Sequence, residues 1–330
     1  MKAAYLRQPG PPQAIEYGDL PEPVPQAGQV LVRMTAVSVN PIDTYIRGGA
    51  KYWELPQPFI IGCDIAGQVE ALGEGVTQFQ IGDRVWGSNQ GLLGRQGTFA
   101  ELCAIDAEWL HPTPDEIDDS SVAASALVAI TAHLGLIGEG QFKPGQTIFV
   151  RGGVGGVGSM VVQMAKAIGG TVIATAGSQA KVELCKSLGA DHVIDYSRED
   201  VSARLSELAP QGVHLFWETL RDPDFDMAVA ALAPRGRMIL MAGRDARPEF
   251  PVGPFYVKGC SLHGFAMFKF SAHEQQVCAA DINHWFATGQ LNALIDRTLP
   301  LSQAAEAHRL QEEHTLGKQS SLAGKIVLTP

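Results

Sequence analysis

The 330-residue chain lacks several patterns that would identify a class of protein at once. Its five cysteines are widely spaced and include no Cys-x-x-Cys pair, which argues against a disulfide framework and against a four-cysteine zinc lobe. Its nine histidines show no His-Glu-x-x-His or comparable metal-binding spacing. We therefore expect the cysteines to be buried structural thiols.

Other absences bear on partners and location. No cluster of Lys and Arg stands out, and the formal net charge is −10, so neither a nucleic-acid nor a membrane-surface partner is expected. No apolar run approaches the roughly 18 residues of a membrane span. The N-terminal residues 1–5 lack the apolar core of a signal peptide. These features predict a cytoplasmic protein.

The organisation of the chain changes near residue 120. The region before it holds short β-prone runs, such as 30–39 and 67–72, separated by Gly and Pro. After it, helix-like segments alternate with expected strands at 147–151, 171–175, 192–195, 213–218, 236–242 and 260–264. This alternation predicts an α/β fold with a parallel sheet covered on both faces. Helices at about 272–288 and 302–314 and a last short strand complete the chain.

The most specific local signal lies in residues 147–177. Gly153, Gly155 and Gly158 have the Gly-x-Gly-x-x-Gly spacing, directly after an expected strand and at the start of an expected helix. In this context the glycines allow the backbone to approach a pyrophosphate, and the N–H groups at the helix N-terminus face the anion. We expect Gly156 and Val157, within the same turn, to contribute to this dinucleotide site.

The end of the second expected strand indicates which nucleotide is bound. An NAD site would place an Asp or Glu there for the ribose hydroxyls, but residues 175–178 read Thr-Ala-Gly-Ser. Lys181 follows in the first turn of a helix, where its positive charge is unfavourable beside the positive end of the helix dipole. The negative charge of a ribose 2′-phosphate would compensate this unfavourable interaction. Gly177, Ser178, Lys181 and Tyr196 are therefore assigned to an NADPH-preferring pocket, although Ser178 can be a plain N-cap and Lys181 a solvated amine.

Five motifs together resemble a known family. They are residues 39–47 (Val-Asn-Pro-Ile-Asp-Thr-Tyr-Ile-Arg), 62–67 (Gly-Cys-Asp-Ile-Ala-Gly), 73–85, the glycine turn with Gln163 and Lys166, and 324–328 (Gly-Lys-Ile-Val-Leu). The chain is similar, over essentially its whole length, to the zinc-independent quinone oxidoreductases (zeta-crystallin-like) of the medium-chain dehydrogenase/reductase superfamily.

This resemblance implies two domains. A GroES-like β-rich catalytic domain would be built from both ends of the chain, residues 1–121 and 266–330. A Rossmann domain, a doubly wound parallel sheet that binds NADP, would be inserted as residues 122–265. A homodimer is also expected from the resemblance, through edge pairing of the nucleotide-domain sheets.

The resemblance also bears on the metal. Zinc alcohol dehydrogenases of the superfamily bind catalytic zinc with an early Cys, a His-Glu pair and a later ligand. In the corresponding stretches this chain has Asn40 and Gly62-Cys63-Asp64. Because Cys63 alone cannot form a tetrahedral site with three or four ligands, we expect no zinc.

The resemblance further implies the residues around the nicotinamide and the substrate. Asn40, Tyr45 and Thr131 would line the cleft, with Tyr45 as the hydrogen-bond donor or proton source. Tyr52 is a rival donor, solvent is another, and each tyrosine can instead be an amphipathic wall residue. Ala242, Gly243 and Phe265 would lie beside the nicotinamide. The roles of Trp217 and Glu218 stay open.

Without zinc, no Lewis acid polarises an alcohol oxygen, whereas a quinone or a conjugated double bond already accepts a hydride readily. The expected function is NADPH-dependent hydride transfer to a small-molecule quinone or α,β-unsaturated carbonyl. Two alternatives are an enoyl-thioester reductase, which would need a basic or open entrance for a large acyl carrier, and an NADPH-binding protein with little catalytic activity.

Overall fold

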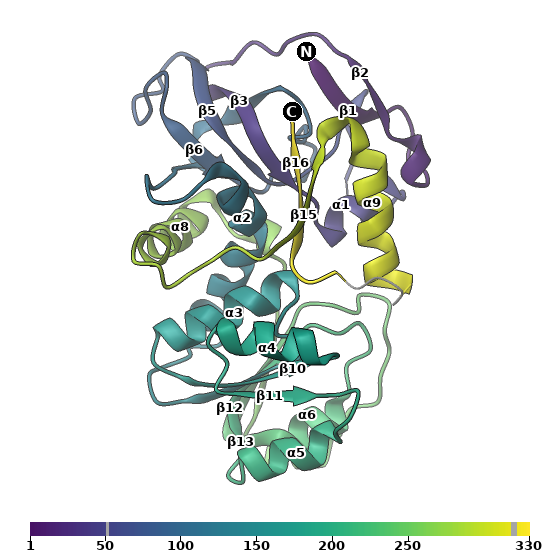
Figure 1. Cartoon of the computed structure of the whole chain (residues 1–330), viewed down its shortest axis with the longest axis vertical. Helices are drawn as coiled ribbons and strands as arrows, with labels where there is room; N and C mark the ends of the chain where they lie inside the picture. The colour runs from purple at the N-terminus through teal and green to yellow at the C-terminus, as the bar shows by residue number, and fades with distance from the viewer. Residues whose placement is uncertain (51–52, 318–321) are drawn as a thin grey trace. The chain divides into compact units, whose positions relative to one another are not determined.

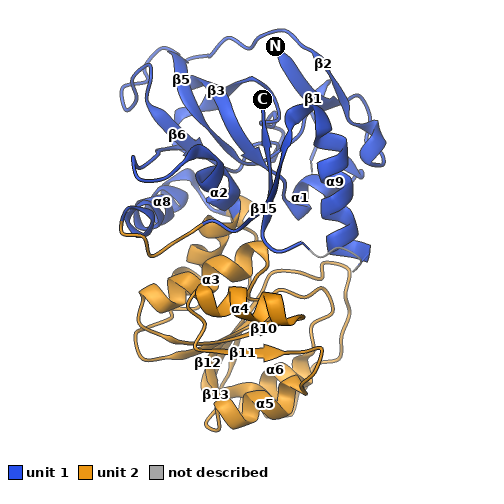
Figure 2. Ribbon diagram, in the orientation of Figure 1, with its two compact units in different colours: residues 1–127, 270–287, 293–330 blue, residues 128–269, 288–292 orange. Residues whose placement is uncertain are grey.

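The computed structural model describes residues 1–50, 53–317 and 322–330, which form two compact units (Figure 2). Unit 1 comprises residues 1–127, 270–287 and 293–330, and unit 2 comprises residues 128–269 and 288–292. The expected division at 121/122 and 265/266 therefore differs by a few residues at each junction. It also missed 288–292, which joins unit 2 because the Gln163 side chain exchanges two hydrogen bonds with the Asn292 backbone.

Unit 1 is the β-rich, GroES-like unit. A seven-stranded sheet has the order β15-β16-β3-β5-β6-β8, with β7 also paired to β3, and a smaller sheet has the order β2-β1-β4. The strands are β1 (Lys2–Leu6), β2 (Glu16–Asp19), β3 (Gln29–Ser38), β4 (Phe59–Ile60), β5 (Ile65–Leu72), β6 (Arg84–Gly87), β7 (Leu102–Asp106), β8 (Leu110–Pro112), β15 (Ile295–Pro300) and β16 (Lys325–Thr329).

The two ends of the chain meet in this unit. Strand β16 pairs antiparallel with β3, with Val327 opposite Ser38, so the last strand lies against the segment that leads into α1 (Figure 1). The main helices of unit 1 are α1 (Pro41–Arg47), α8 (Ala272–Ala287) and α9 (Ala304–Glu312). Helix α1 is tied to α9 by an ion pair between Arg47 and Glu312 at 2.9 Å. The C-terminal segment is therefore an integral part of the first unit.

Unit 2 contains the predicted doubly wound parallel sheet. Its order is β11-β10-β9-β12-β13-β14, so the chain moves outward from β9 in one direction and then in the other. The strands are β9 (Thr147–Val150), β10 (Thr171–Ala176), β11 (His192–Asp195), β12 (Val213–Glu218), β13 (Leu232–Leu240) and β14 (Ser261–Gly264). Every predicted strand of this region is present, and β13 begins four residues earlier than expected.

Helices cover this sheet and build its core. They are α3 (Gly156–Ala167), α4 (Gln179–Ser187), α5 (Val201–Leu208), α6 (Phe225–Ala231) and α7 (Val252–Val257). One buried cluster joins Phe149, Ile173 and Phe216 of the sheet with Leu205 of α5 and Phe225 of α6. The switch of direction between β9 and β12 places the glycine turn where open α/β sheets bind their ligands.

One expectation about apolar runs is wrong. The helical segment Asp119–Glu139, formed by α2 (Asp119–His133) and the turn that follows it, is long and apolar enough to cross a membrane. However, 78% of its most apolar window is buried inside the protein. Its small side chains, mostly Ala and Ser, allow close packing on all sides, so the segment is a core helix.

Candidate functional site

The glycine turn connects β9 to α3 in unit 2. Gly155 is the N-cap of α3, and the turn is held against β10 by Thr175. The Thr175 hydroxyl accepts a hydrogen bond from Gly152 N at 2.9 Å, and the Thr175 carbonyl accepts one from Gly153 N at 3.0 Å. The first N–H groups of α3 have no partner within the helix, as at any helix N-terminus, so they provide donors for an anion.

The glycines of this turn are required for different reasons. A Cβ at Gly153 would lie 2.6 Å from the Cys185 sulfur, and one at Gly158 would overlap the Gly152 carbonyl. Both positions therefore need glycine for packing within the protein. At Gly155 φ is −73°, and a Cβ there would meet only the Gly152 oxygen, at 3.4 Å. Neither backbone conformation nor a neighbouring side chain requires glycine at 155.

The end of β10 carries the residues predicted for the nucleotide ribose. Ser178 is the N-cap of α4, and its hydroxyl accepts a hydrogen bond from the backbone N–H of Lys181 at 3.4 Å. Tyr196 follows β11, and its side chain is 60% exposed. The phenol lies directly over Gly177, where any Cβ would overlap it. The structure thus brings Gly177, Ser178 and Tyr196 to adjacent strand ends, with Lys181 in the first turn of α4.

Two residues whose roles the sequence left open belong to the buried interior. Trp217 and Glu218, at the end of β12, are fully buried. The Glu218 carboxylate pairs with Arg151 at 2.8 Å and accepts the Leu220 N–H at 2.8 Å. Burial raises the pKa of Glu218, and Arg151 opposes that rise. The pair ties the residue before the glycine turn to the end of β12.

The residues predicted beside the nicotinamide follow β13 and β14. Gly243 has φ of +78°, and a Cβ there would overlap the Arg221 carbonyl, so the fold itself requires this glycine. Ala242 precedes it and is half-buried. Phe265 follows β14, and its ring lies with the Trp217 indole against Gly135, where any Cβ would come within 3 Å of both rings.

The predicted catalytic residues are divided between the units. Asn40 and Tyr45 belong to unit 1, at the N-cap and within α1, whereas Thr131 belongs to unit 2 and is 5% exposed. Tyr45 is half-buried. Tyr52 lies outside the residues that the structure describes. Asn40 is fully buried, and both ends of its side-chain amide bond within unit 1.

A polar network surrounds Asp64, which is fully buried and was not among the residues predicted for the site. One carboxylate oxygen accepts hydrogen bonds from the Ser38 hydroxyl and the Asn40 amide, both at 2.7 Å. The other accepts from the Ser88 hydroxyl at 2.7 Å and from the Leu127 backbone N–H at 3.0 Å. A charged residue inside two apolar motifs, Cys-Asp-Ile-Ala and Gly-Lys-Ile-Val, was the signal that could have revealed it.

The network also contains Lys325, Asp43 and Cys63. The Lys325 ammonium donates to the Asn40 side-chain oxygen and lies 3.9 Å from Asp64. Asp43 accepts hydrogen bonds from the Asn40 backbone N–H at 2.8 Å and from the Cys63 thiol at 2.9 Å. Burial raises the pKa of Asp43 to about 7 and raises the pKa of the Cys63 thiol well above its usual value. Burial also lowers the pKa of Lys325, while Asp64 and Asp43 oppose that change.

These donors do not suit zinc. Within residues 1–50, 53–317 and 322–330, no group of three or more His, Cys, Asp and Glu side chains is placed to hold a metal ion. The Cys63 thiol is protonated and bonded to Asp43, and the Asn40 amide already bridges Asp64 and Lys325. An ammonium beside a divalent cation would be repelled by it.

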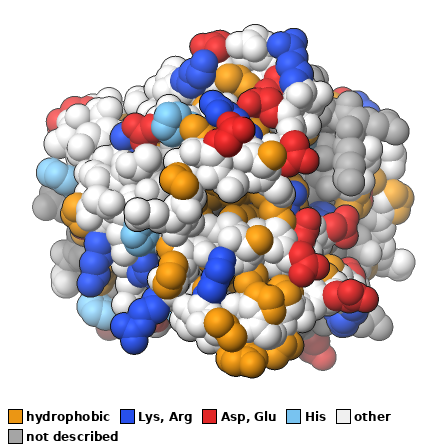
Figure 3. All heavy atoms as spheres, turned by 90° about the horizontal axis from the view of Figure 1, so that it is seen from below, with side chains coloured by type: hydrophobic (Ala, Val, Ile, Leu, Met, Phe, Trp, Pro, Cys, Tyr) orange, Lys and Arg blue, Asp and Glu red, His pale blue; other side chains and the backbone are white. Residues whose placement is uncertain are grey.

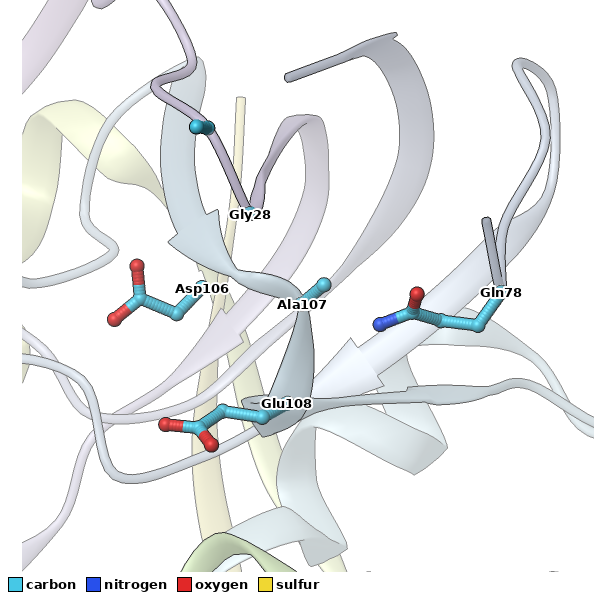
Figure 4. A pocket seen from close by; sticks show the side chains of 6 residues that line it. Gly28, Gln78, Asp106, Ala107 and Glu108 are labelled. Carbon is cyan, nitrogen blue, oxygen red and sulfur yellow. The ribbon is translucent and has the colours of Figure 1, made fainter. Parts of the chain in front are cut away.

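A separate hollow of about 340 Å³ lies in unit 1 (Figure 4). It is lined by Ala27, Gly28, Gln78, Asp106, Ala107 and Glu108. The Asp106 carboxylate accepts a hydrogen bond from the Gln29 side chain at 2.9 Å. None of the predicted site residues belongs to its described lining, so this hollow is not part of the candidate site.

Comparison with known proteins shows which families and structures the chain is similar to. Residues 26–115 match the alcohol dehydrogenase GroES-like domain, and residues 156–281 match the zinc-binding dehydrogenase family. The chain is 30% identical to a quinone oxidoreductase of Lama guanicoe over 99% of this chain and 97% of that protein. It is 28% identical to a 2-haloacrylate reductase of a Burkholderia species, over 99% of this chain and 98% of that protein. The crystal structure of Escherichia coli quinone oxidoreductase complexed with NADPH superposes with a TM-score of 0.87 at 25% identity and covers both chains fully.

The raised pKa of Asp43 predicts a pH-dependent stability. Between about pH 4 and pH 7 the Asp43 carboxyl is protonated in the folded protein and ionised in the unfolded chain. The stability that this protonation contributes is therefore fully present below about pH 4 and is lost as pH rises to about 7. From pH 5 to pH 8, wild type should lose about 2–3 kcal/mol relative to Asp43→Asn in urea unfolding. The same pH dependence in both proteins would contradict the buried, protonated carboxyl.

Proposed function

Because the chain belongs to the quinone oxidoreductase group of the medium-chain dehydrogenase/reductase superfamily and is an oxidoreductase, we propose that it uses NADPH to reduce a quinone or an α,β-unsaturated carbonyl without zinc. The glycine at position 155 is the observation that supports the binding of NADPH. Glycine costs conformational entropy on folding, yet nothing in the described protein requires it there. The close approach of a pyrophosphate to the backbone accounts for it.

The preference for NADPH over NADH rests on the ends of β10 and β11. The side chain that a ribose 2′-hydroxyl would need, an Asp or Glu at the end of β10, is replaced by residues 175–178. Lys181 and the exposed Tyr196 phenol offer a cation and a hydroxyl donor for a 2′-phosphate instead. The complex of the Escherichia coli relative with NADPH supports NADPH as the cofactor.

The residues of the chain have three tasks in this reaction. NADPH supplies the hydride when bound. Tyr45 and Thr131 position the reactants and exclude water, the buried Asn40 holds the first turn of α1, and Tyr45 donates a hydrogen bond to the oxygen on which negative charge develops. Tyr45 is half-buried and lies on the short helix α1, which fixes the position of its backbone. Quinones and enones suit such a site because their own carbonyl stabilises the developing charge.

Variants at the cofactor site separate these roles. Gly155→Ala should weaken the binding of NADPH and NADH alike, about tenfold or more, because a methyl group would occupy the space of the pyrophosphate.

Lys181→Ala should weaken NADPH binding by a similar factor and leave NADH binding almost unchanged. Gly138→Ala, at an exposed position of unit 2 with nothing within 4 Å of the added methyl, is the control and should change neither. Cofactor fluorescence titration measures all three, and equal losses for both cofactors in Lys181→Ala would refute the phosphate role.

The substrate class is tested with three probes. NADPH oxidation should be fast with benzoquinone or cyclohexenone and slow with crotonyl-coenzyme A, because no cluster of Lys and Arg stands out in the sequence to mark an entrance for an acyl carrier. The 2-haloacrylate reductase among the relatives supports activated double bonds as substrates. Fast turnover of the thioester alone would favour the enoyl-thioester alternative, and tight NADPH binding without any turnover would favour a binding protein.

We also propose that the protein is a cytoplasmic homodimer without a nucleic-acid partner. The face drawn in Figure 3 carries acidic, basic and apolar side chains rather than one basic field. Strand β14 is an edge of the unit 2 sheet, and Val252, Tyr256, Val257 and Leu262 are exposed on it and on α7. Pairing of two such edges would bury these side chains.

The dimer has its own test. Wild type should sediment as a dimer at micromolar concentration, and Tyr256→Asp, which places a charge in the apolar surface, should shift it toward monomer. A monomeric wild type at that concentration would contradict the proposed interface.

A further inference from the structure

The start of β16 places a buried cation beside the start of α1. Gly324 has φ of +102°, and any Cβ would overlap the Leu294 carbonyl, so only glycine allows the chain to turn here. The next residue, Lys325, is fixed by its backbone N–H, which donates to the same Leu294 carbonyl at 2.8 Å. On the other side, Val39 N donates to the Ile326 carbonyl at 3.0 Å. These bonds hold the Lys325 side chain next to Asn40.

The Asn40 amide is committed at both ends. Its nitrogen donates to Asp64 at 2.7 Å, and its oxygen accepts from the Lys325 ammonium. An Asn at an N-cap usually turns its side chain onto the N–H groups of its own helix. Here the side chain belongs both to the network and to the capping box of α1, in which Asp43 reaches back to the Asn40 N–H at 2.8 Å. The N-terminus of α1 is thus oriented by bonds to β16 and to the segment before β5.

The charges of the network explain why a lysine is present. The titratable groups that face it, among the described residues, are Asp43 on α1, Cys63 and Asp64 before β5, and Lys325 on β16. Burial raises the pKa of Asp64 as well, but Lys325 and the four hydrogen bonds that Asp64 accepts oppose that rise, so Asp64 is the better stabilised carboxylate. Asp43 accepts two and retains its proton up to about pH 7, as its raised pKa indicates. One ammonium then balances one carboxylate.

We propose that Lys325 is a positioning residue for the reaction: its ammonium fixes the Asn40 amide and thereby the first turn of α1, the helix that carries Tyr45. This inference rests on the proposed function, in which Tyr45 on α1 donates a hydrogen bond to the substrate. Lys325 acts through Asn40 and does not contact the reactants.

A purely structural role would be limited to charge balance, so the test removes the charges and varies only the hydrogen bond. Lys325→Met together with Asp64→Asn leaves the network neutral but without a donor for the Asn40 oxygen. Lys325→Gln together with Asp64→Asn is also neutral and retains an N–H donor. Both double variants avoid an uncompensated buried charge, and thermal unfolding checks that each is folded.

The readouts are kcat and the KM for NADPH, with the faster of benzoquinone and cyclohexenone as substrate. The Met/Asn variant should lose about 10- to 100-fold in kcat with KM for NADPH unchanged, because a misplaced group slows the chemical step while the nucleotide site lies in unit 2. The Gln/Asn variant, which shares the Asp64→Asn change, should have a kcat about 10-fold or more above that of the Met/Asn variant.

Equal kcat values in the two double variants, high or low, would overturn the inference, because the hydrogen bond to Asn40 would then make no difference. A wild-type enzyme without turnover on either substrate would instead refute the proposed function, and this inference with it. The two failures are therefore distinguishable in one experiment.

Discussion

Unit 1 depends on one constraint, the complete burial of the Asp64 carboxylate. A buried charge costs several kcal/mol unless it is paired and hydrogen-bonded. Its partners come from β3, the segment after β6, α2 and β16, with Lys325 lying 285 residues beyond Asn40 in the chain. Satisfying Asp64 therefore requires both ends of the chain to be in place. The same bonds determine the position of α1, so the stability of this unit and the geometry of its candidate site have a common origin.

The nucleotide turn shows how similar residues can have different physical roles. Gly153 and Gly158 are needed because Cys185 and the Gly152 carbonyl leave no space for a side chain. Gly155 has space and an ordinary backbone conformation. A sequence motif gives the three glycines equal weight, whereas the structure separates two that packing within the protein requires from one that it does not.

The sequence predicted most of the fold because its signals are local. Apolar runs of β-prone residues between helical segments located all the strands of unit 2, and the missing acid after β10 can be read without coordinates. The pairing of Arg151 with Glu218, and of Asn40 with Lys325, could not be predicted, because it depends on strand neighbours far apart in the chain. Residues 288–292 were assigned to the wrong unit for the same reason, since they are tied to unit 2 by hydrogen bonds to Gln163, which lies far away in the chain.

We propose that the β9–α3 turn and the ends of β10 and β11 form an NADPH site, and a crystal structure of the protein with NADPH would test this proposal. We expect the pyrophosphate at the backbone of Gly155–Val157 and the ribose 2′-phosphate beside Lys181 and Tyr196. A 2′-phosphate directed into solvent, away from both side chains, or a cofactor bound elsewhere on the chain, would contradict it.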